Sequence, residues 1–154
     1  MAEEKRIILI TGASRGIGKA IASYLADQQH HIIVNYRSQK EAAQQVVDQI
    51  NAQGGHASTM GFDVADTEQV NAAIQTIVKE FGGVDVLINN AGIPLDGLLM
   101  RYKDEDFDRS IAVNLKGAYL CSKAVLKSMM KRKKDGRIIM LSSVVGQMGN
   151  AGQS

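Results

Sequence analysis

The stretch RIILITGASRGIG, residues 6–18, joins a short apolar run to a turn that holds three glycines. An apolar run without polar alternation is typical of a strand that is buried on both faces, as in a parallel sheet. Gly12, Gly16 and Gly18 would allow a sharp turn, a close approach of the backbone to a ligand, and tight packing of a following helix. The stretch therefore predicts a strand, a glycine-rich loop and a helix.

The same alternation of strand and helix continues along the chain. Further strands are expected at 31–36, 57–62, 84–89 and 137–142. Helices are expected after the glycine loop and over 39–53, 67–81 and about 105–133. Connections of this length are too long for hairpins and favour parallel crossovers. We therefore expect an α/β fold, with a doubly wound (Rossmann-like) parallel sheet of five strands and helices on both faces.

Local signals predict where two of these helices begin and end. Asp66 stands in the N-cap position of the helix 67–81, whose apolar residues recur at helical spacing. Ser38 with Glu41 three residues later resembles a capping box at the start of the preceding helix. Gly54 with Gly55 is expected to end that helix.

The composition limits the function classes. A length of 154 residues fits one domain, residues 1–154, and a net charge of +2 gives no reason to expect nucleic acid. The sequence contains no apolar stretch long enough for a signal peptide or a membrane span, so we expect a cytoplasmic protein. Its one cysteine, Cys121, lies in a helical pattern and is expected to be a packed thiol. No metal site is predicted.

The glycine loop is a candidate nucleotide site. Its spacing is G-x-x-x-G-x-G, which differs from the common G-x-G-x-x-G. Free backbone amides and the positive end of a helix suit a pyrophosphate. A tight connection without any ligand would use the same residues, so the loop alone leaves both interpretations open.

The end of the second strand, VNYRS at 34–38, bears on the choice of cofactor. Dinucleotide sites that prefer NAD place a carboxylate near the ribose 2′-hydroxyl, whereas this chain has Tyr36 and Arg37 there, with Arg15 in the glycine loop. An arginine fork can hold a phosphate through two hydrogen bonds. The pattern favours NADPH, and the alternative is a solvated arginine at a strand end.

Several motifs occur in a characteristic order: TGASRGIG (11–18), FDV (62–64), NNAG (89–92), VN (113–114) and IIMLSSVVG (138–146). Together they resemble the short-chain dehydrogenase/reductases over nearly the whole chain. Within that family, DGLLMR (96–101) and SSVVGQMGNAGQ (142–153) resemble the 3-oxoacyl-[acyl-carrier-protein] reductases of bacterial fatty-acid synthesis.

That resemblance implies NADPH-dependent reduction of a 3-oxoacyl thioester to a 3-hydroxyacyl product. Two alternatives remain. The substrate could instead be acetoacetyl-CoA or a polyketide ketone, or the chain could be a dinucleotide-binding module without catalysis.

The resemblance also assigns residues to the cofactor. It places Asp63 and Val64 at the adenine ring and Asn90, Ala91 and Gly92 at the ribose. Asp63 as a turn cap and NNAG as ordinary turn chemistry are the alternatives. The full implied set is Gly12, Ser14, Arg15, Gly16, Ile17, Gly18, Arg37, Ser38, Asp63, Val64, Asn90, Ala91 and Gly92.

For catalysis, the resemblance implies Ser143, whose hydroxyl would bond the substrate carbonyl, with Ser142 as the alternative if the alignment is shifted by one. It implies that Asn114 bends the long helix and holds a water of a proton relay. In the family, a Tyr-x-x-x-Lys pair follows the serine, and no tyrosine follows Ser143 here. We therefore expect an incomplete domain, with the later strands and helices missing, that is inactive alone.

A basic cluster closes the long helix: Lys131, Arg132, Lys133, Lys134 and Arg137. It is a candidate docking site for an acidic acyl carrier protein. A solvated helix end whose cations favour the helix dipole is the alternative. The family resemblance further implies a homo-oligomer, a tetramer that assembles through the long helix.

Overall fold

The structure is a computed structural model that describes residues 5–133 and 135–153. Five parallel strands form one sheet in the order β3-β2-β1-β4-β5. They are β1(Arg6–Ile10), β2(His30–Tyr36), β3(Ala57–Gly61), β4(Val86–Asn89) and β5(Arg137–Met140). The predicted doubly wound fold is confirmed, with each strand within two residues of its expected bounds.

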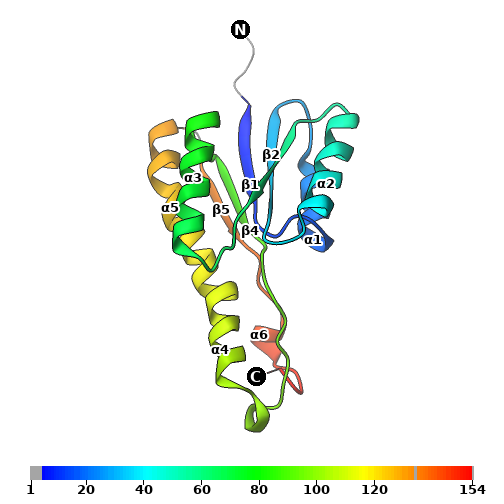
Figure 1. The fold of residues 1–154 in the computed structure, drawn as a ribbon, viewed down its shortest axis with the longest axis vertical. Helices are drawn as coiled ribbons and strands as arrows, with labels where there is room; N and C mark the ends of the chain where they lie inside the picture. The colour runs from blue at the N-terminus through cyan, green and yellow to red at the C-terminus, as the bar shows by residue number, and fades with distance from the viewer. Residues whose placement is uncertain (1–4, 134, 154) are drawn as a thin grey trace.

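Helices cover both faces of the sheet (Figure 1). On one side lie α1(Gly16–Leu25) and α2(Lys40–Ala52), and on the other lie α3(Thr67–Phe81) and α5(Gly117–Arg132). Successive residues of β1 serve these two layers in turn: Leu9 packs in the core with α3 and α5, and Ile10 packs in the core with α1 and α2. Both are fully buried. This explains why the strand reads as an unbroken apolar run.

One predicted helix cap is confirmed and the other is wrong. The side chain of Asp66 accepts hydrogen bonds from the backbone amides of Glu68 and Gln69 at 2.9 and 3.0 Å. Ser38 does not cap α2, because that helix begins one residue later than the capping box requires, with Gln39 in the N-cap position and no side-chain cap. Ser38 is left free to face a cavity described below.

The long helix predicted over about 105–133 forms, with an irregular middle. It runs through α4(Asp104–Ser110), a π-helical segment η2(Ile111–Lys116), and α5. The backbone stays helical at both junctions, with φ and ψ of −59° and −48° at Ser110 and of −63° and −37° at Lys116. The wide π turn was not predicted, and it carries Asn114.

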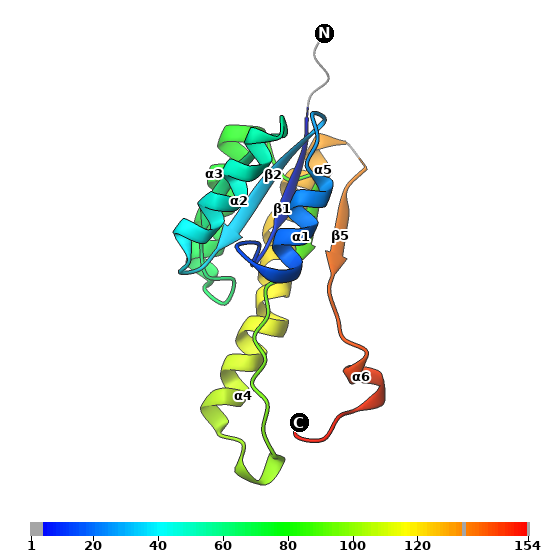
Figure 2. The same cartoon turned by 90° about the vertical axis from the view of Figure 1, so that its right-hand side faces the viewer.

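Two short elements also lie outside the sequence prediction: η1(Leu99–Arg101) and α6(Val145–Met148). With α4 they form an extension that projects beyond the carboxyl ends of the strands (Figure 2). Within the described ranges, no helix is both long enough and apolar enough to span a membrane.

Candidate functional site

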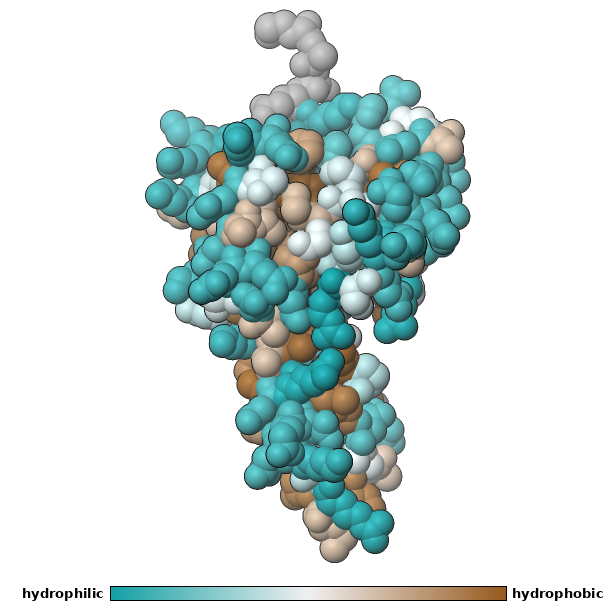
Figure 3. All heavy atoms as spheres, in the orientation of Figure 1, coloured by the Kyte–Doolittle hydropathy of each residue, from teal (hydrophilic) through white to brown (hydrophobic). Residues whose placement is uncertain are grey.

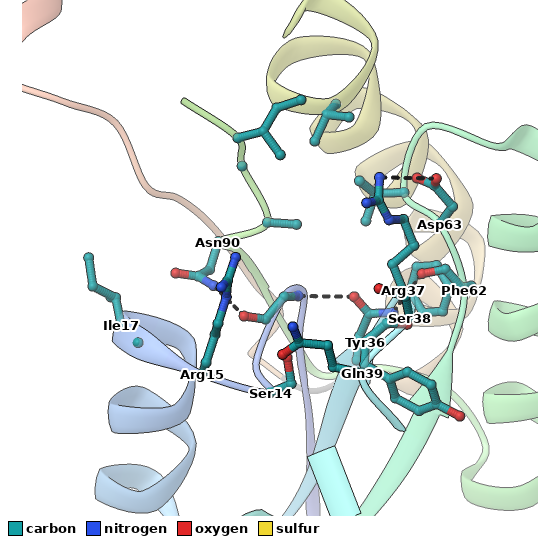
Figure 4. Close-up of a pocket in the computed structure, with 18 residues that line it drawn as sticks. Ser14, Arg15, Ile17, Tyr36, Arg37, Ser38, Gln39, Phe62, Asp63 and Asn90 are labelled. Atoms are coloured by element: carbon teal, nitrogen blue, oxygen red, sulfur yellow. Dashed lines mark hydrogen bonds and ion pairs between the residues drawn. The ribbon is translucent and has the colours of Figure 1, made fainter. Parts of the chain in front are cut away.

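A cavity of about 390 Å³ opens at the carboxyl ends of the strands (Figure 4). This is the edge at which open α/β sheets bind ligands. The structure places twelve of the thirteen predicted cofactor residues on its wall: Gly12, Ser14, Arg15, Gly16, Ile17, Arg37, Ser38, Asp63, Val64, Asn90, Ala91 and Gly92. They come from four separate segments of the chain.

Gly18 is the predicted residue that does not line the cavity. It is buried, and a Cβ there would lie 2.5 Å from Asn90 Nδ2 and 2.6 Å from the Gly12 carbonyl oxygen. Gly12 itself has a φ of 63°, in the left-handed region that glycine tolerates. The two glycines thus let the loop bend tightly and pack directly against the chain after β4.

Thr11 and Asn90 fasten the glycine loop to the segment after β4. Thr11 Oγ1 accepts hydrogen bonds from the backbone amides of Asn90 and Ala91, both at 3.0 Å. Asn90 Nδ2 donates back to the carbonyl oxygens of Thr11 and Gly12 at 2.9 and 3.0 Å. The structure therefore gives Asn90 a role in shaping the loop in addition to its place on the cavity wall.

Asn35 is a site residue that sequence reasoning missed. Its Oδ1 accepts from the Gly12 amide at 3.0 Å, and its Nδ2 donates to the carbonyl oxygens of Met60 and Phe62, each at 3.1 Å. One buried amide thus joins β1, β2 and β3 beneath the cavity. The signal was available, because a lone asparagine interrupts the apolar run HIIVNY and a buried amide requires partners.

The start of α1 is suited to an anion. Among the described residues no side chain caps this helix, and its N-cap residue Arg15 is exposed on the cavity wall. Uncapped amides at a helix N-terminus carry partial positive charge, which favours phosphate. Figure 4 shows Arg15 pointing from the loop toward the cavity. The residues present therefore fit a pyrophosphate.

Arg37 and Asp63 face each other across the other end of the cavity. Arg37 Nη1 lies 3.9 Å from Asp63 Oδ2, and Figure 4 shows the pair at the cavity rim. The Arg37 side chain is 49% exposed, so its guanidinium is only loosely held. Asp63 also caps a turn, because its Oδ1 accepts from the Ala65 amide at 2.9 Å. The turn-cap alternative for Asp63 is thus observed, together with a place in the site.

A second cavity, of about 510 Å³, adjoins the first. Val64 and Ala91 line both cavities, so the segment after β4 forms part of the wall between them. The polar residues on the wall of the second cavity are Thr11, Asn89, Asn114, Tyr119, Ser122 and Ser142. A cavity with several hydroxyl and amide groups, next to the candidate cofactor cavity, can receive a polar group of a substrate.

Asn114 uses its side chain to hold the wall between the two cavities. Its Oδ1 accepts from the Ile93 amide at 2.8 Å and its Nδ2 donates to the Ile93 carbonyl oxygen at 3.0 Å. Nδ2 also lies 3.2 Å from Ser110 Oγ, one helical turn earlier. The side chain thus clamps the loop after β4, and it does so from the π turn, a feature frequent at functional sites.

The structure places the two candidate serines differently. Ser142 lines the second cavity, whereas Ser143 stands next in the chain and its Oγ accepts from the Val145 amide at 3.2 Å. Both are exposed. The assignment of Ser143 as the catalytic serine stays a prediction, and the geometry keeps Ser142 as the alternative.

The Tyr-x-x-x-Lys spacing does occur in this sequence, at two tyrosines that precede Ser143. It is only after Ser143 that residues 1–154 contain no such pair. The pairs are Tyr36 with Lys40 and Tyr119 with Lys123. Lys123 Nζ lies 5.7 Å from the centre of the Tyr119 ring, and Tyr119 lines the second cavity. Tyr36 lines the first cavity, and neither pair follows the serine, where the family places its tyrosine.

The predicted docking cluster loses one of its members. Arg132 is directed inward and pairs with the buried Asp85, so its side chain is only 7% exposed. Lys131, Lys133 and Arg137 are exposed and remain candidates for the docking surface. Lys134 lies outside the described residues.

Cys121 is fully buried in the core, and burial raises the pKa of its thiol to about 12. The expectation of a packed thiol is confirmed. Within residues 5–133 and 135–153 no cluster of three or more His, Cys, Asp or Glu residues could hold a metal ion.

Comparison with known proteins agrees with this geometry. The chain is 47% identical over 146 residues to the 3-oxoacyl-[acyl-carrier-protein] reductase FabG of Staphylococcus aureus (strain N315), covering 95% of this chain and 59% of that protein. It is 48% identical over 149 residues to the 3-oxoacyl-[acyl-carrier-protein] reductase of Synechocystis sp. (strain ATCC 27184 / PCC 6803 / Kazusa), covering 97% of this chain and 60% of that protein. The family model described as short chain dehydrogenase matches residues 6–154. The chain therefore belongs to the short-chain dehydrogenase family.

Proposed function

We propose that the protein to which this chain belongs reduces a 3-oxoacyl thioester of acyl carrier protein to the 3-hydroxyacyl thioester, with NADPH as the hydride donor. The observation that carries the proposal is the first cavity, which combines the uncapped N-terminus of α1 with Arg15 and Arg37. The names of the relatives support the choice of substrate, although the chain spans only 59% and 60% of their lengths.

The cofactor would lie with its pyrophosphate at the glycine loop and its 2′-phosphate near Arg37 and Arg15. Bound NADPH would supply the hydride that reduces the ketone. The chain's own contribution is orientation. Thr11, Asn35 and Asn90 fix the loop and the wall through buried and half-buried hydrogen bonds, so the loop that lines the cavity is already held in place.

On the substrate side, Ser143 would donate a hydrogen bond to the ketone oxygen, with Ser142 as the alternative. Asn114 would hold the wall between cofactor and substrate through Ile93. Family members take the proton for the ketone oxygen from a tyrosine that follows the serine.

The direct test follows NADPH absorbance while acetoacetyl thioesters of acyl carrier protein and of CoA are supplied to the protein that carries this sequence. Faster turnover per enzyme on the carrier-protein thioester supports the proposal. Equal efficiency on both favours the alternative, a reductase of CoA thioesters or polyketide ketones. NADPH binding without reduction of either substrate favours the non-catalytic module.

The exposed face of the long helix supports self-association of the protein. Apolar side chains recur along it at helical spacing and are 41–77% exposed: Phe107, Ile111, Leu115, Tyr119, Leu126 and Met130. Figure 3 shows apolar surface on the extension that this helix helps to form. The first turn of α4 is acidic and the last turn of α5 is basic. Two copies packed antiparallel would bring opposite charges together.

We propose that this pairing contributes to a tetramer. Sedimentation at low and high salt tests it. A larger species that Leu115→Glu dissociates supports the pairing, whereas a monomer at all concentrations opposes it.

A further inference from the structure

Two loops that follow neighbouring strands meet at the far end of the extension. One loop follows β4 and carries Asp96 and Gly97, and the other follows β5 and carries Gly152 and Gln153. The Gly97 amide donates to the Gly152 carbonyl oxygen at 2.7 Å, and Gln153 Nε2 donates to Asp96 Oδ1 at 3.1 Å. These four residues are called the Asp96 clasp below.

The segment between β5 and the clasp carries both candidate serines. Its own hydrogen bonds are short-range turns, such as that from the Met148 amide to the Val144 carbonyl oxygen at 3.1 Å. Among the described residues, the hydrogen bonds that join Leu141–Gln153 to other segments lie at its two ends. One is the bond from the Leu141 amide to the Asn89 carbonyl oxygen at 3.0 Å, and the others form the clasp.

Gln153 is itself held in place for this contact. Its side-chain Oε1 accepts a hydrogen bond from Asn150 Nδ2 at 3.0 Å, and its backbone amide donates to the Asn150 carbonyl oxygen at 3.1 Å. Gly149 and Gly152 have φ of 70° and 78°, which turns the chain back toward the loop after β4. The acceptor is a carboxylate, so the hydrogen bond across the loops is charge-assisted.

We propose that Asp96 and Gln153 are positioning residues. They hold the serine segment at a fixed place relative to the loop after β4, whose residue Ala91 lines both cavities. Neither side chain touches the reacting atoms. Their contribution is to keep the serine hydroxyl at a set distance from the wall that Asn114 clamps. The clasp itself is inferred from the structure alone. Its effect on catalysis rests on the proposed function.

The experiment compares Asp96→Ala, Gln153→Ala and the double variant in the protein that carries this sequence. Asp96→Asn keeps an acceptor oxygen in place and is the conservative variant. Glu80→Ala, which removes an exposed carboxylate of α3 outside both loops, is the matched control. Amide hydrogen exchange over residues 142–153 and steady-state kinetics on an acetoacetyl thioester are the two measurements.

For Asp96→Ala we expect exchange over residues 142–153 to rise about 10-fold or more, as for a lost charge-assisted hydrogen bond. A misplaced serine should lower kcat ~10- to 100-fold, with the KM for NADPH unchanged. Gln153→Ala should have the same effect as Asp96→Ala, and the double variant should show little further change. In Asp96→Asn, both the exchange rate and kcat should be close to those of the unmodified protein.

Exchange over residues 142–153 that matches the Glu80→Ala control would overturn the clasp. Faster exchange with unchanged kcat would overturn the positioning role. A protein that reduces no 3-oxoacyl thioester would refute the proposed function, while the exchange measurement would still decide whether the clasp exists.

Discussion

Arg132 and Asp85 form a buried ion pair through two hydrogen bonds. Arg132 Nε lies 2.6 Å from Asp85 Oδ1, and Nη2 lies 3.0 Å from Oδ2. The same guanidinium donates to the Phe81 carbonyl oxygen at 2.8 Å, and Asp85 Oδ2 accepts from the Ile7 amide at 2.8 Å. The pair therefore ties the ends of α3 and α5 to the starts of β1 and β4.

Arg132→Ala should destabilise the fold strongly. It would leave the Asp85 carboxylate buried without a counter-charge, and loss of one partner of such a pair costs ~3–5 kcal/mol. Urea unfolding gives the free energy, with Lys133→Ala, an exposed neighbour, as the control. A loss below about 1 kcal/mol, typical of surface pairs, would contradict the assignment.

Arg37→Ala should reduce the affinity for NADPH much more than the affinity for NADH. A hydrogen bond to a charged group contributes ~1.5–3 kcal/mol, which corresponds to a rise in Kd of ~10- to 150-fold. Fluorescence titration with both nucleotides measures the two constants. Lys40→Ala removes a nearby cation from the first turn of α2 and is the control. Equal losses for both nucleotides would show that Arg37 does not contact the 2′-phosphate.

Gly18→Ala should damage both stability and cofactor binding. The new methyl group would lie 2.5 Å from Asn90 Nδ2, so the loop and the wall after β4 must move apart. Overpacking of this kind costs ~1–3 kcal/mol. Gly146→Ala meets no atom within 4 Å and is the matched control for stability. Thermal unfolding and nucleotide titration of both variants measure the two effects. A Gly18→Ala protein that melts and binds nucleotide like Gly146→Ala would show that the packing around Gly18 is looser than described.

Folding stability should fall as the pH drops below about 6.5 because of His31. Burial, and then the positive charges of His56 and Lys5, lower the pKa of the His31 imidazole below its ordinary value of 6.5. The unfolded chain therefore takes up a proton at a higher pH than the folded chain does. The His31 contribution is complete above pH 6.5 and is lost progressively on acidification toward the lowered folded pKa.

Urea unfolding at pH 8 and at pH 5 measures this effect. His31→Gln should show a smaller loss between the two values, because glutamine does not titrate. His31 Nε2 lies 2.9 Å from Ser58 Oγ, a contact that the glutamine amide can imitate. An unchanged difference in the variant would assign the pH dependence to other groups.

Charge reversal at Lys131 and Lys133 should weaken turnover on carrier-protein thioesters and leave CoA thioesters unaffected. Both lysines are exposed at the end of α5, and attraction to an acidic carrier would fall with added salt. Lys79→Glu, a charge reversal at the end of α3, is the control for each single reversal. If both thioesters respond alike to the reversal, the cluster is a solvated helix end.

The sequence was sufficient to predict the sheet because its strands are buried on both faces. In β1, the residues from Ile7 to Ile10 enter different layers alternately, so all four must be apolar, and such a run is easily recognised. The cap at Asp66 was equally predictable, since its partners lie two and three residues away. The sequence also indicated that most residues on the wall of the first cavity lie together, because strand ends of a parallel sheet converge on one edge.

The remaining features depend on contacts between distant residues. Arg132 was assigned to a surface cluster because nothing local indicates that Asp85, forty-seven positions earlier, would receive it. The role of Asn35 depends on where Gly12, Met60 and Phe62 meet in space. At Ser38, a shift of one residue in the start of α2 removes the predicted cap. Apolar periodicity also cannot separate a π turn from an α turn within six residues.

The π turn at Ile111–Lys116 has a consequence for how the chain can change. A turn closed by an i→i+5 hydrogen bond holds one residue more than an α turn. Deleting a single residue there would convert the π turn into an α turn. The helices α4 and α5 would still present the same faces to their neighbours. Asn114, in contrast, would lose its position opposite Ile93. A one-residue deletion there would therefore remove the contact between Asn114 and Ile93 while the sheet and its flanking helices stay in place.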